Sequence, residues 1–495
     1  MTGIEPASKA GEALILPMNY IRICWIRIYF IIIRLFVKYQ SVSKKIQKLT
    51  LLRQDYGSVF LYWGHTKINR LGGMKVEKFV ITGMEDGLRG RVRISGSKNA
   101  ALPILAACLL TEEVCEICNV PPLSDVRDMA ELIRGLGAEV TLREDAESVL
   151  VQAKVLQTVS TAEETARKMR ASFLAAGALL GRCGQAVLPL PGGCQIGSRP
   201  VDLHLKGFQT MGVKVKQEHG MVEMAAKHLK GGEIYLDFPS VGATENILLA
   251  AVLAKGETII RNAAAEPEIC DLAEFLRKMG ADIMGDGTDT IRIIGVKRLH
   301  GAVHQVIPDR IEAGTFMAAA AITGGDILLQ EVREEHLKPV IAKLTECNVK
   351  TEKTEEGLRV YRKGKLQPIQ LKTMPYPGFP TDMQAQFMSL MALAKGTSVI
   401  TETVFENRFL HAGELQRMGA DIRIDSRNAV IEGVEILTGA KVRATDLRAG
   451  AALILSALTA KGDTEISDIY HIERGYHDIE GKLRRLGANI RREEE

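Results

Sequence analysis

The sequence lacks a marked excess of charge of either sign, since 64 Lys and Arg face 60 Asp and Glu and leave a net charge of +4. The positive net charge comes from the first 73 residues, which hold eleven basic and three acidic residues. The remaining 422 residues carry 53 basic and 57 acidic ones. Proteins that bind nucleic acid neutralise phosphates with clustered Lys and Arg. We therefore expect no nucleic-acid binding by the main body of the chain.

The usual phosphate-binding motifs are also absent. Neither GxxxxGK[ST] nor a GxGxxG after a predicted strand occurs, which argues against ATP and dinucleotide sites. The eight cysteines are scattered, which favours a cytoplasmic protein over a secreted disulfide framework. Cys115 and Cys118 form a CxxC in a segment whose alternation predicts a strand, and no second pair completes a zinc site. We expect no metal and no cofactor.

Residues 1–73 differ from the rest of the chain. The run Ile21–Val37 is strongly apolar, but Arg22, Arg27 and Arg34 interrupt it, and the longest uncharged stretch between them is six residues. A membrane-spanning helix needs about 20 mostly apolar residues. We favour a translated upstream leader outside the mature protein, with a new start at Met74; a membrane-surface segment and a disordered tail stay open as alternatives.

A helix end followed by a strand start recurs along the main body. Gly or Asn closes the helix each time, at intervals of 75, 68, 68, 71 and 68 residues. Both residue types suit the left-handed conformation that ends a helix. These closing residues predict six units of about 70 residues each: Gly137, Gly212, Gly280, Asn348, Gly419 and Gly487.

An Ala- and Leu-rich segment recurs in the same units. Examples are LPILAACLL, TFMAAAAI and GAALILSALTA, each followed by a β-rich segment such as GTSVITET. A helix that is apolar on every side must be buried. We therefore predict an α/β protein of six βαβ-type repeats with helices inside and sheets outside, grouped three and three into two domains.

Polar residues stand just before these apolar segments. Helix N-termini attract anions through free N–H groups and the helix dipole. Several such ends that converge with Lys and Arg would bind a multiply anionic substrate, although the plain alternative for any one of them, above all for a single Asp, is a helix cap or a surface ion pair. The candidates are Lys98, Asn99, Arg170, Ser240, Val241, Gly242, Asp309, Arg310, Asp382, Asp446 and Arg448.

The segment LPLPGGCQIGSRPVDLH, residues 188–204, is the most specific. Glycines on both sides of Cys194 predict an exposed thiol on a loop, and Arg199 would lower its pKa if the loop folds back. A buried, inert cysteine is the plain alternative. The flanking glycines argue against it.

Together with SGSKNAALPIL, MRAS, PSVGATEN, FPTDMQAQF, TVFENRF, TDLRAG and YHIERGY, this segment resembles the UDP-N-acetylglucosamine 1-carboxyvinyltransferase family of enolpyruvyl transferases. The resemblance covers the chain from Met74 nearly to its end. It implies an inside-out α/β barrel of two domains with the active site in the cleft between them. One domain would combine 74–97 with 308–495, and the other, with the Cys194 loop, would span 98–307.

The implied reaction transfers the enolpyruvyl group of phosphoenolpyruvate to the 3'-hydroxyl of UDP-N-acetylglucosamine and releases phosphate, the first committed step of peptidoglycan synthesis. In the family pattern Cys194 matches the acid, Asp382 the base, and Lys98 and Arg474 the catalytic cations. No partner is implied other than these two small molecules, and no oligomeric state. The matching substrate-binding positions are Lys98, Asn99, Arg170, Arg199, Pro200, Val201, Asp202, Leu203, His204, Ser240, Val241, Gly242, Asp382, Val404, Arg408, Asp446, Arg448 and Arg474.

One position departs from the family pattern. Phe238 stands where some members place a Lys against the diphosphate. Two alternatives to the assignment are the same chemistry on shikimate 3-phosphate and a regulatory paralogue without catalysis. The cysteine loop and RPVDLH argue against the first, and the complete set of cations and acids argues against the second.

Overall fold

The computed structural model describes residues 49–50, 62–63, 77–191, 197 and 200–494, and the chain divides into two compact units, Met1–Lys75 and Val76–Glu495. Nearly all of residues 1–73 lie outside the described residues, so the expectations for them stay predictions. In the first unit two short strands, β1 (Leu49–Thr50) and β2 (Tyr62–Trp63), pair antiparallel.

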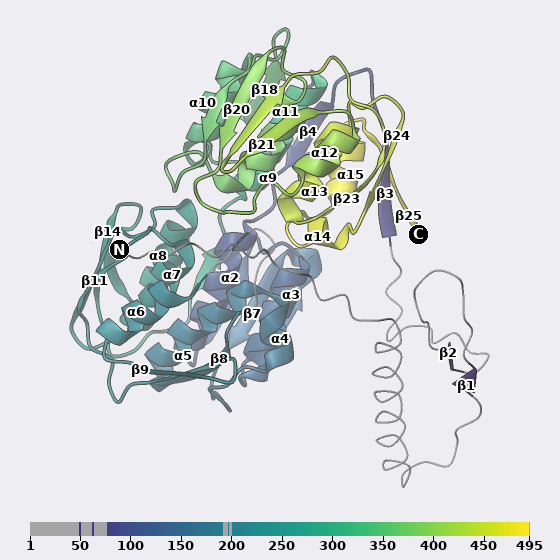
Figure 1. The fold of residues 1–495 in the computed structure, drawn as a ribbon. Helices are drawn as coiled ribbons and strands as arrows, with labels where there is room; N and C mark the ends of the chain where they lie inside the picture. The colour runs from purple at the N-terminus through teal and green to yellow at the C-terminus, as the bar shows by residue number, and fades with distance from the viewer. Residues whose placement is uncertain (1–48, 51–61, 64–76, 192–196, 198–199, 495) are drawn as a thin grey trace, which may run out of the picture. The chain divides into compact units, whose positions relative to one another are not determined.

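The second unit contains six sheets among its described residues, one for each predicted repeat (Figure 1). Five have four strands and one has three. The six closing residues predicted from the sequence all have positive φ, from 68° at Asn348 to 108° at Gly137. The predicted period of the repeat is therefore confirmed.

One unit illustrates the repeat. Strand β11 (Glu233–Tyr235) leads into helix α7 (Val241–Ala251), and β12 (Glu257–Arg261) returns parallel to β11. Helix α8 (Pro267–Lys278) follows. The antiparallel strands β13 (Asp282–Met284) and β14 (Thr290–Ile294) complete the sheet. In this unit the βαβ element thus gains a second helix and a hairpin.

The inner helices of the six units are buried as predicted. In α9, every residue from Ile311 to Ile322 is buried. Each Å² of apolar surface removed from water stabilises the fold by roughly 25 cal/mol. The apolar helices therefore lie in the core, and the sheets lie outside them. The inner helices are α2 (Lys98–Ala107), α5 (Ala175–Cys183), α7, α9 (Arg310–Thr323), α11 (Gln384–Met391) and α13 (Leu447–Ala457).

The outer helices close each repeat, and short helices lie between them. The remaining helices are α3 (Ser124–Gly135), α4 (Glu163–Lys168), α6 (Asp202–Thr210), α8, α10 (Lys338–Glu346), α12 (Ala412–Arg417), α14 (Tyr470–Glu473) and α15 (Ile479–Arg485).

Three sheets are completed by strands that are distant in the sequence, the third of them through the parallel pairing of Arg89–Arg93 with Asp326–Gln330. Strand β15 (Val303–Gln305) pairs parallel with β5 (Val114–Cys118). Near the N-terminus, β3 (Glu77–Thr82) lies between β24 (Asp463–Ser467) and β25 (Asn489–Glu494). The CxxC cysteines lie in β5, so the predicted strand at this segment is confirmed.

The remaining strands follow the same pattern. They are β4 (Arg89–Arg93), β6 (Glu139–Arg143), β7 (Ser148–Gln152), β8 (Gln185–Pro189), β9 (Lys214–Glu218), β10 (Met221–Ala225), β16 (Asp326–Gln330), β17 (Val349–Thr354), β18 (Gly357–Arg362), β19 (Gln370–Lys372), β20 (Thr397–Thr401), β21 (Asp421–Asp425), β22 (Asn428–Glu432) and β23 (Lys441–Arg443).

The buried hydrophobic residues form two separate clusters. Core one is drawn from residues 100–307, and core two from 79–94 and 311–490. The chain passes between them twice, and there Ser97 N donates to Ile307 O at 2.8 Å and Asp309 N donates to Ser95 O at 2.8 Å. These clusters are compatible with the predicted limits at 97/98 and 307/308, which stay a prediction.

A buried ion pair lies beside this crossing. Lys482 Nζ donates to Ser95 Oγ at 2.7 Å and also contacts the Glu312 carboxylate, which in turn accepts from Ser95 N at 2.9 Å. The Lys482 and Glu312 side chains are 8% and 3% exposed. This cluster ties α9 and α15 to the segment that enters α2.

We expect Lys482→Met to lower the free energy of unfolding by about 3–5 kcal/mol, because it leaves the Glu312 carboxylate buried without its cation. Urea-induced unfolding measures the change. Lys441→Met, at a side chain that is 80% exposed, is the control and should change stability little. An equal loss in both variants would contradict the structural role of the buried pair.

Candidate active site

Two predicted cations meet on one carboxylate at the junction of the cores. Lys98 Nζ, at the start of α2, lies 3.0 Å from Asp125 Oδ2, and Arg474 Nε lies 2.8 Å from Asp125 Oδ1. Asp125 belongs to α3 and is 4% exposed. Arg474 follows α14, which packs in core two, so Asp125 joins residues from both cores.

The environment of Asp125 favours its charged form. Burial raises the pKa of the carboxyl, but the charges of Lys98 and Arg474 and their hydrogen bonds outweigh this effect and lower it. The result is a site with two cations and one anion, in which a bound phosphate or carboxylate of a substrate would add negative charge. Asp125 therefore holds the two cations close together before any substrate arrives.

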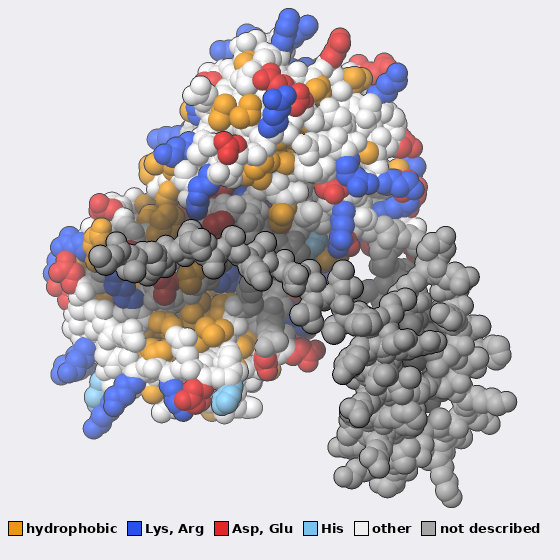
Figure 2. All heavy atoms as spheres, in the orientation of Figure 1, with side chains coloured by type: hydrophobic (Ala, Val, Ile, Leu, Met, Phe, Trp, Pro, Cys, Tyr) orange, Lys and Arg blue, Asp and Glu red, His pale blue; other side chains and the backbone are white. Residues whose placement is uncertain are grey.

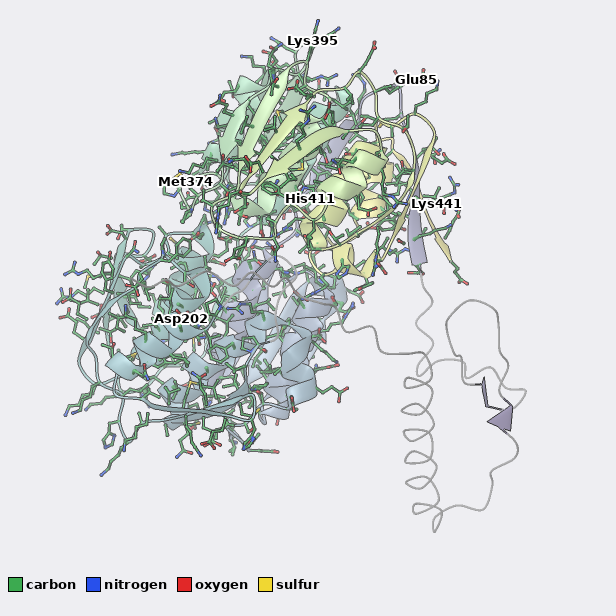
Figure 3. The ribbon with its side chains drawn as sticks, in the orientation of Figure 1. Glu85, Asp202, Met374, Lys395, His411 and Lys441 are labelled. Carbon is green, nitrogen blue, oxygen red and sulfur yellow. The ribbon has the colours of Figure 1, made fainter. Side chains whose placement is uncertain are left out.

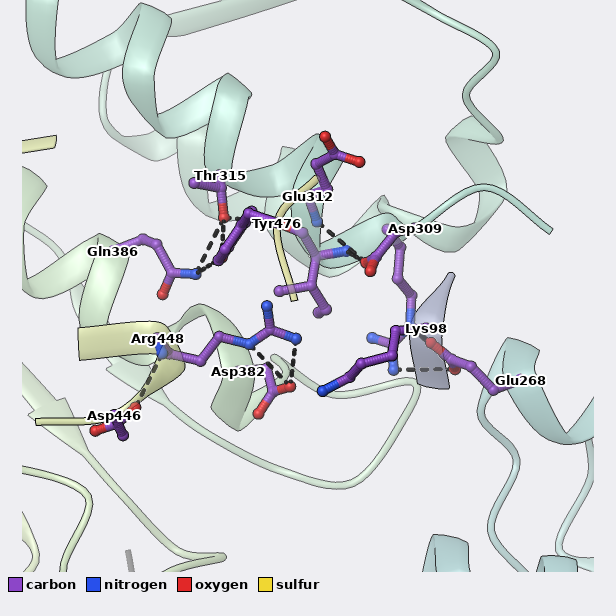
Figure 4. Close-up of polar contacts among 12 residues, drawn as sticks. Lys98, Glu268, Asp309, Glu312, Thr315, Asp382, Gln386, Asp446, Arg448 and Tyr476 are labelled. Carbon is purple, nitrogen blue, oxygen red and sulfur yellow. Dashed lines mark hydrogen bonds and ion pairs between the residues drawn. The ribbon is translucent and has the colours of Figure 1, made fainter. Parts of the chain in front are cut away.

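A second carboxylate is held by two arginines. Asp382 Oδ1 accepts from Arg408 Nη2 at 2.8 Å, and Oδ2 accepts from Arg448 Nε at 3.2 Å and Nη2 at 2.9 Å. Both arginine side chains are nearly buried, at 5% and 4% exposed, whereas Asp382 is 28% exposed. In Figure 4, Lys98 points towards the same carboxylate.

The two arginines determine the charge of Asp382. Burial raises the pKa of this carboxyl, but the charges of Arg448 and Arg408 outweigh this effect and hold the pKa far below its usual range. Asp382 is consequently ionised at neutral pH. It is also a weak base for as long as both arginines hold it.

Arg448 is fixed from its other side by a buried polar group. Its guanidinium lies 5.4 Å from the centre of the Tyr476 ring. The Tyr476 hydroxyl is 2.9 Å from Thr315 Oγ1 and accepts from Gln386 Nε2 at 3.3 Å. Three inner helices, α9, α11 and α13, thus share one network behind Asp382 (Figure 4).

Several candidate residues turn out to cap helices. Asp446 Oδ1 accepts from Arg448 N at 2.9 Å and Ala449 N at 3.1 Å. Asp309 caps α9 in the same way, and Ser240 Oγ accepts from Ala243 N at 3.4 Å at the start of α7. The structure thus uses the Asp446 side chain to start α13, and its effect on the site passes through Arg448.

His204, in the first turn of α6, lies buried beside the start of α7. Its Nδ1 accepts from Asn246 Nδ2 at 2.9 Å, and the same Nδ2 donates to Phe173 O at 2.9 Å. Asn246 Oδ1 accepts from Gly177 N at 2.7 Å, which fixes the orientation of the amide. The imidazole therefore carries its proton on Nε2, the atom nearer to Gly242.

The loop predicted to carry the acid is described only in part. Cys194 and Arg199 lie outside the described residues, so their roles stay predictions. Arg170 Nη2 donates to Pro200 O at 3.3 Å. Gly197 lies against Glu406, since a Cβ on it would be 2.1 Å from Glu406 Oε2. This places one described residue of the loop beside the segment that follows β20.

The other predicted positions lie at helix starts or in loops. Val201, Asp202 and Leu203 are at the beginning of α6, where Asp202 is exposed (Figure 3). Val241 and Gly242 begin α7, and Asn99 is exposed in the first turn of α2. Phe238 is 42% exposed and lies two residues before the Ser240 cap.

Sequence reasoning missed three acidic residues near the site. Asp125 looked like an ordinary acid in the first turn of a helix, and Glu268, which accepts from Arg310 Nε at 3.0 Å, looked the same. Glu402 accepts from Val404 N at 2.7 Å, so it shapes a predicted binding position. Of the three, only Glu402 has a signal in the sequence, because it directly follows the predicted strand of a repeat.

The described residues hold no group of three or more His, Cys, Asp or Glu side chains arranged to bind a metal ion. In this part of the chain no helix is both long and apolar enough to cross a membrane. The face seen in Figure 2 mixes Lys and Arg with Asp and Glu.

Comparisons with known proteins identify the family of the chain. The family model described as EPSP synthase (3-phosphoshikimate 1-carboxyvinyltransferase) matches residues 84–483. A UDP-N-acetylglucosamine 1-carboxyvinyltransferase 1 of Caldanaerobacter subterraneus subsp. tengcongensis is 58% identical over 415 residues, which are 84% of this chain and 99% of that protein. A UDP-N-acetylglucosamine 1-carboxyvinyltransferase 2 of Carboxydothermus hydrogenoformans is 57% identical over 419 residues, with the same coverage.

Solved structures show the same architecture. The enolpyruvyl transferase NikO from Streptomyces tendae has a TM-score of 0.77 at 27% identity and covers 85% of this chain and 100% of its own. An EPSP synthase from Acinetobacter baumannii has a TM-score of 0.65 at 20% identity, covers 84% of this chain and 100% of its own, and supports the fold alone.

Six repeats in an inside-out α/β arrangement, with cations gathered at the inner helix starts, define an enolpyruvyl transferase. Given the extent of these matches, the chain belongs to the EPSP synthase family and, within it, to the UDP-N-acetylglucosamine 1-carboxyvinyltransferases.

The charge of Asp382 leads to a pH-dependent prediction. Asp382→Asn should lower the free energy of unfolding at neutral pH by about 2 kcal/mol, because Arg408 and Arg448 lose a charged acceptor. Because the folded pKa is depressed, this advantage of the wild type is complete above about pH 4, the ordinary pKa of Asp, and shrinks as the pH falls below it.

Urea unfolding of both proteins between pH 3 and pH 8 measures the difference, with Asp421→Asn on exposed strand β21 as the control. A gap between the wild type and Asp382→Asn that is unchanged at pH 3 would contradict the depressed pKa of Asp382.

Proposed function

We propose that the chain transfers the enolpyruvyl group of phosphoenolpyruvate to the 3'-hydroxyl of UDP-N-acetylglucosamine and releases phosphate. The observation that carries the proposal is the Asp382 carboxylate, held by Arg408 and Arg448 beside Lys98. Relatives named for this activity are 58% and 57% identical. The shikimate 3-phosphate reaction is named by the broad family model, and an EPSP synthase is a relative in fold at 20% identity.

Lys98 and Arg474 would bind phosphoenolpyruvate. They converge on Asp125 from different cores, and such a pair suits the phosphate and carboxylate of one small anion. Arg170 and Arg199 would add positive charge from the side of the loop. Phosphate release creates further negative charge, and fixed cations stabilise the transition state in which it develops.

Asp382 would orient the sugar hydroxyl and accept its proton. In the described state the two arginines make it a weak base, so substrate binding must weaken at least one of these ion pairs and raise its pKa. The hydroxyl oxygen then attacks C2 of phosphoenolpyruvate while Cys194 delivers a proton to C3. Removal of a proton from C3 and departure of phosphate regenerate the double bond.

The UDP-sugar would lie across helix starts. Ser240, Val241 and Gly242 begin α7, and the positive end of a helix dipole suits the diphosphate. Val201–His204 begin α6, with His204 Nε2–H as a donor. Asn99, Pro200, Val404 and Asp446 complete the proposed contacts.

Wider assignments follow from this reaction. The product would enter peptidoglycan synthesis in the cytoplasm and so support cell-wall growth, cell shape and division, and the thiol of Cys194 would make the enzyme a target of fosfomycin. We also propose the domain limits 74–97 with 308–495 and 98–307, supported by the two hydrophobic cores.

A phosphate-release assay tests the reaction. Purified protein should release phosphate only when phosphoenolpyruvate and UDP-N-acetylglucosamine are both present, and mass spectrometry should find the enolpyruvyl ether of the nucleotide sugar. Release with shikimate 3-phosphate but not with the UDP-sugar would overturn the proposal in favour of the other acceptor. Release with neither acceptor would support a paralogue without catalysis.

The proposed role of Cys194 gives a separate prediction. Cys194→Asp should keep turnover, because a carboxyl also donates a proton, and should resist fosfomycin, an epoxide that alkylates thiolates. Cys183→Asp, at an exposed cysteine outside the site, is the control and should stay sensitive. An inactive but folded Cys194→Asp would count against the thiol as proton donor.

A further inference from the structure

The residue directly after the second strand of a repeat has a constant role in four units. Asn119, Asn262, Glu331 and Asp468 follow β5, β12, β16 and β24, and all four have a left-handed backbone, with φ of 57°, 53°, 52° and 56°. Such a conformation is uncommon for residues other than glycine. Its recurrence marks this position as a fixed part of the repeat.

The side chains at this position fasten the end of the first strand. Asn119 Nδ2 donates to Val306 O at 2.9 Å, and Asn262 Nδ2 donates to Leu236 O at 2.7 Å. Glu331 Oε2 accepts from Arg93 Nε at 2.9 Å, and Asp468 pairs with Arg443. In these units the residue therefore joins two neighbouring parallel strands.

Glu402 occupies this position in the unit that carries Asp382, but it behaves differently. It follows β20, its φ is not positive, and it is 1% exposed. It keeps the contact with the first strand, since Oε1 accepts from Thr373 Oγ1 at 2.9 Å, directly after β19. The rest of the carboxylate is turned towards other partners.

These partners lie on the two segments that build the Asp382 site. Glu402 Oε1 also accepts from Val404 N at 2.7 Å and Phe405 N at 3.1 Å, which begin the loop that leads to Arg408. Its Oε2 accepts from Thr381 Oγ1 at 2.8 Å, in the residue before Asp382. One buried carboxylate thus fastens the arginine segment and the aspartate segment to the same point.

We propose that Glu402 is a positioning residue of the active site. It holds the Val404–Arg408 loop and the Thr381–Asp382 segment together, so that Arg408 meets Asp382 and the main chain at Val404 keeps its place against the sugar nucleotide. This inference rests on the proposed function. All four partners of the carboxylate are neutral donors. The position of its two oxygens therefore matters more than its charge, and a side chain of the same shape should replace it in large part.

Two substitutions separate geometry from the loss of the side chain. Glu402→Gln keeps Oε1 for the two main-chain N–H groups and for Thr373, and its amide can donate to Thr381. Glu402→Ala leaves two half-buried N–H groups and two hydroxyls without their acceptor. Thr381→Val removes the contact to Oε2 alone and serves if Glu402→Ala does not fold.

Steady-state kinetics should show a split between the two substrates. In Glu402→Ala, kcat/KM for the UDP-sugar should fall on the order of tenfold to 100-fold, the effect of a displacement of about 1 Å, with KM for phosphoenolpyruvate changed much less. Glu402→Gln should stay within about fivefold of the wild type, and Thr381→Val should lie between them. Glu331→Ala, at the equivalent repeat position but 51% exposed, is the matched control and should retain wild-type kinetics.

A readout that does not depend on activity completes the test. Hydrogen exchange of the Val404 and Phe405 amides should become at least about tenfold faster in Glu402→Ala, while the amides of β20 keep their protection. Unchanged exchange there, or a KM for phosphoenolpyruvate that rises as much as the KM for the UDP-sugar, would overturn the positioning role. If the wild type does not turn over the two substrates, while exchange is still faster in Glu402→Ala, the proposed function is overturned and the structural role of Glu402 stays in place.

Discussion

The fold depends on the burial of helices that are apolar on every side. Such a helix leaves no polar face for water, so each of the six inner helices must be covered all round, and the sheets are forced to the outside. The sides of these helices are therefore buried and cannot bind charged molecules. Chemistry is confined to the helix starts, where free N–H groups and short polar sequences occur.

The site shows how this confinement is used. Lys98 begins α2, Arg310 begins α9, and Arg448 lies in the first turn of α13, so the positive charge is carried by helix starts that come from different repeats. Each of these cations is already paired with a carboxylate of the protein. Arg474 and Arg408 share two of these carboxylates, so the site keeps a local excess of positive charge on a main body that is mildly acidic overall.

The local sequence pattern was sufficient to predict the repeat. It could not predict which distant strands complete the sheets. The closing residues such as Gly280 and Asn348 are recognisable because one residue type satisfies one backbone conformation. By contrast, nothing in Val303–Gln305 specifies that it pairs with β5, since any three-residue strand with a buried central residue has the same alternation. Asp382 and Lys98 came from motifs, whereas the roles of Asp125 and Glu402 depend on partners that only folding brings near. Cys194 and Arg199 stay predictions.

The placement of β3 has a consequence for the order of folding during synthesis. This strand is made first among the main-body strands, yet Thr82 contacts Asp463, 381 residues later. At about 5–20 residues per second, the ribosome takes roughly 20–80 s to cover that distance. Core one is complete in the chain long before then, so β3 and β4 must wait beside a finished neighbour with their pairing edges open. Lys78 and the arginines of β4 give these waiting strands a charge that discourages pairing with another chain.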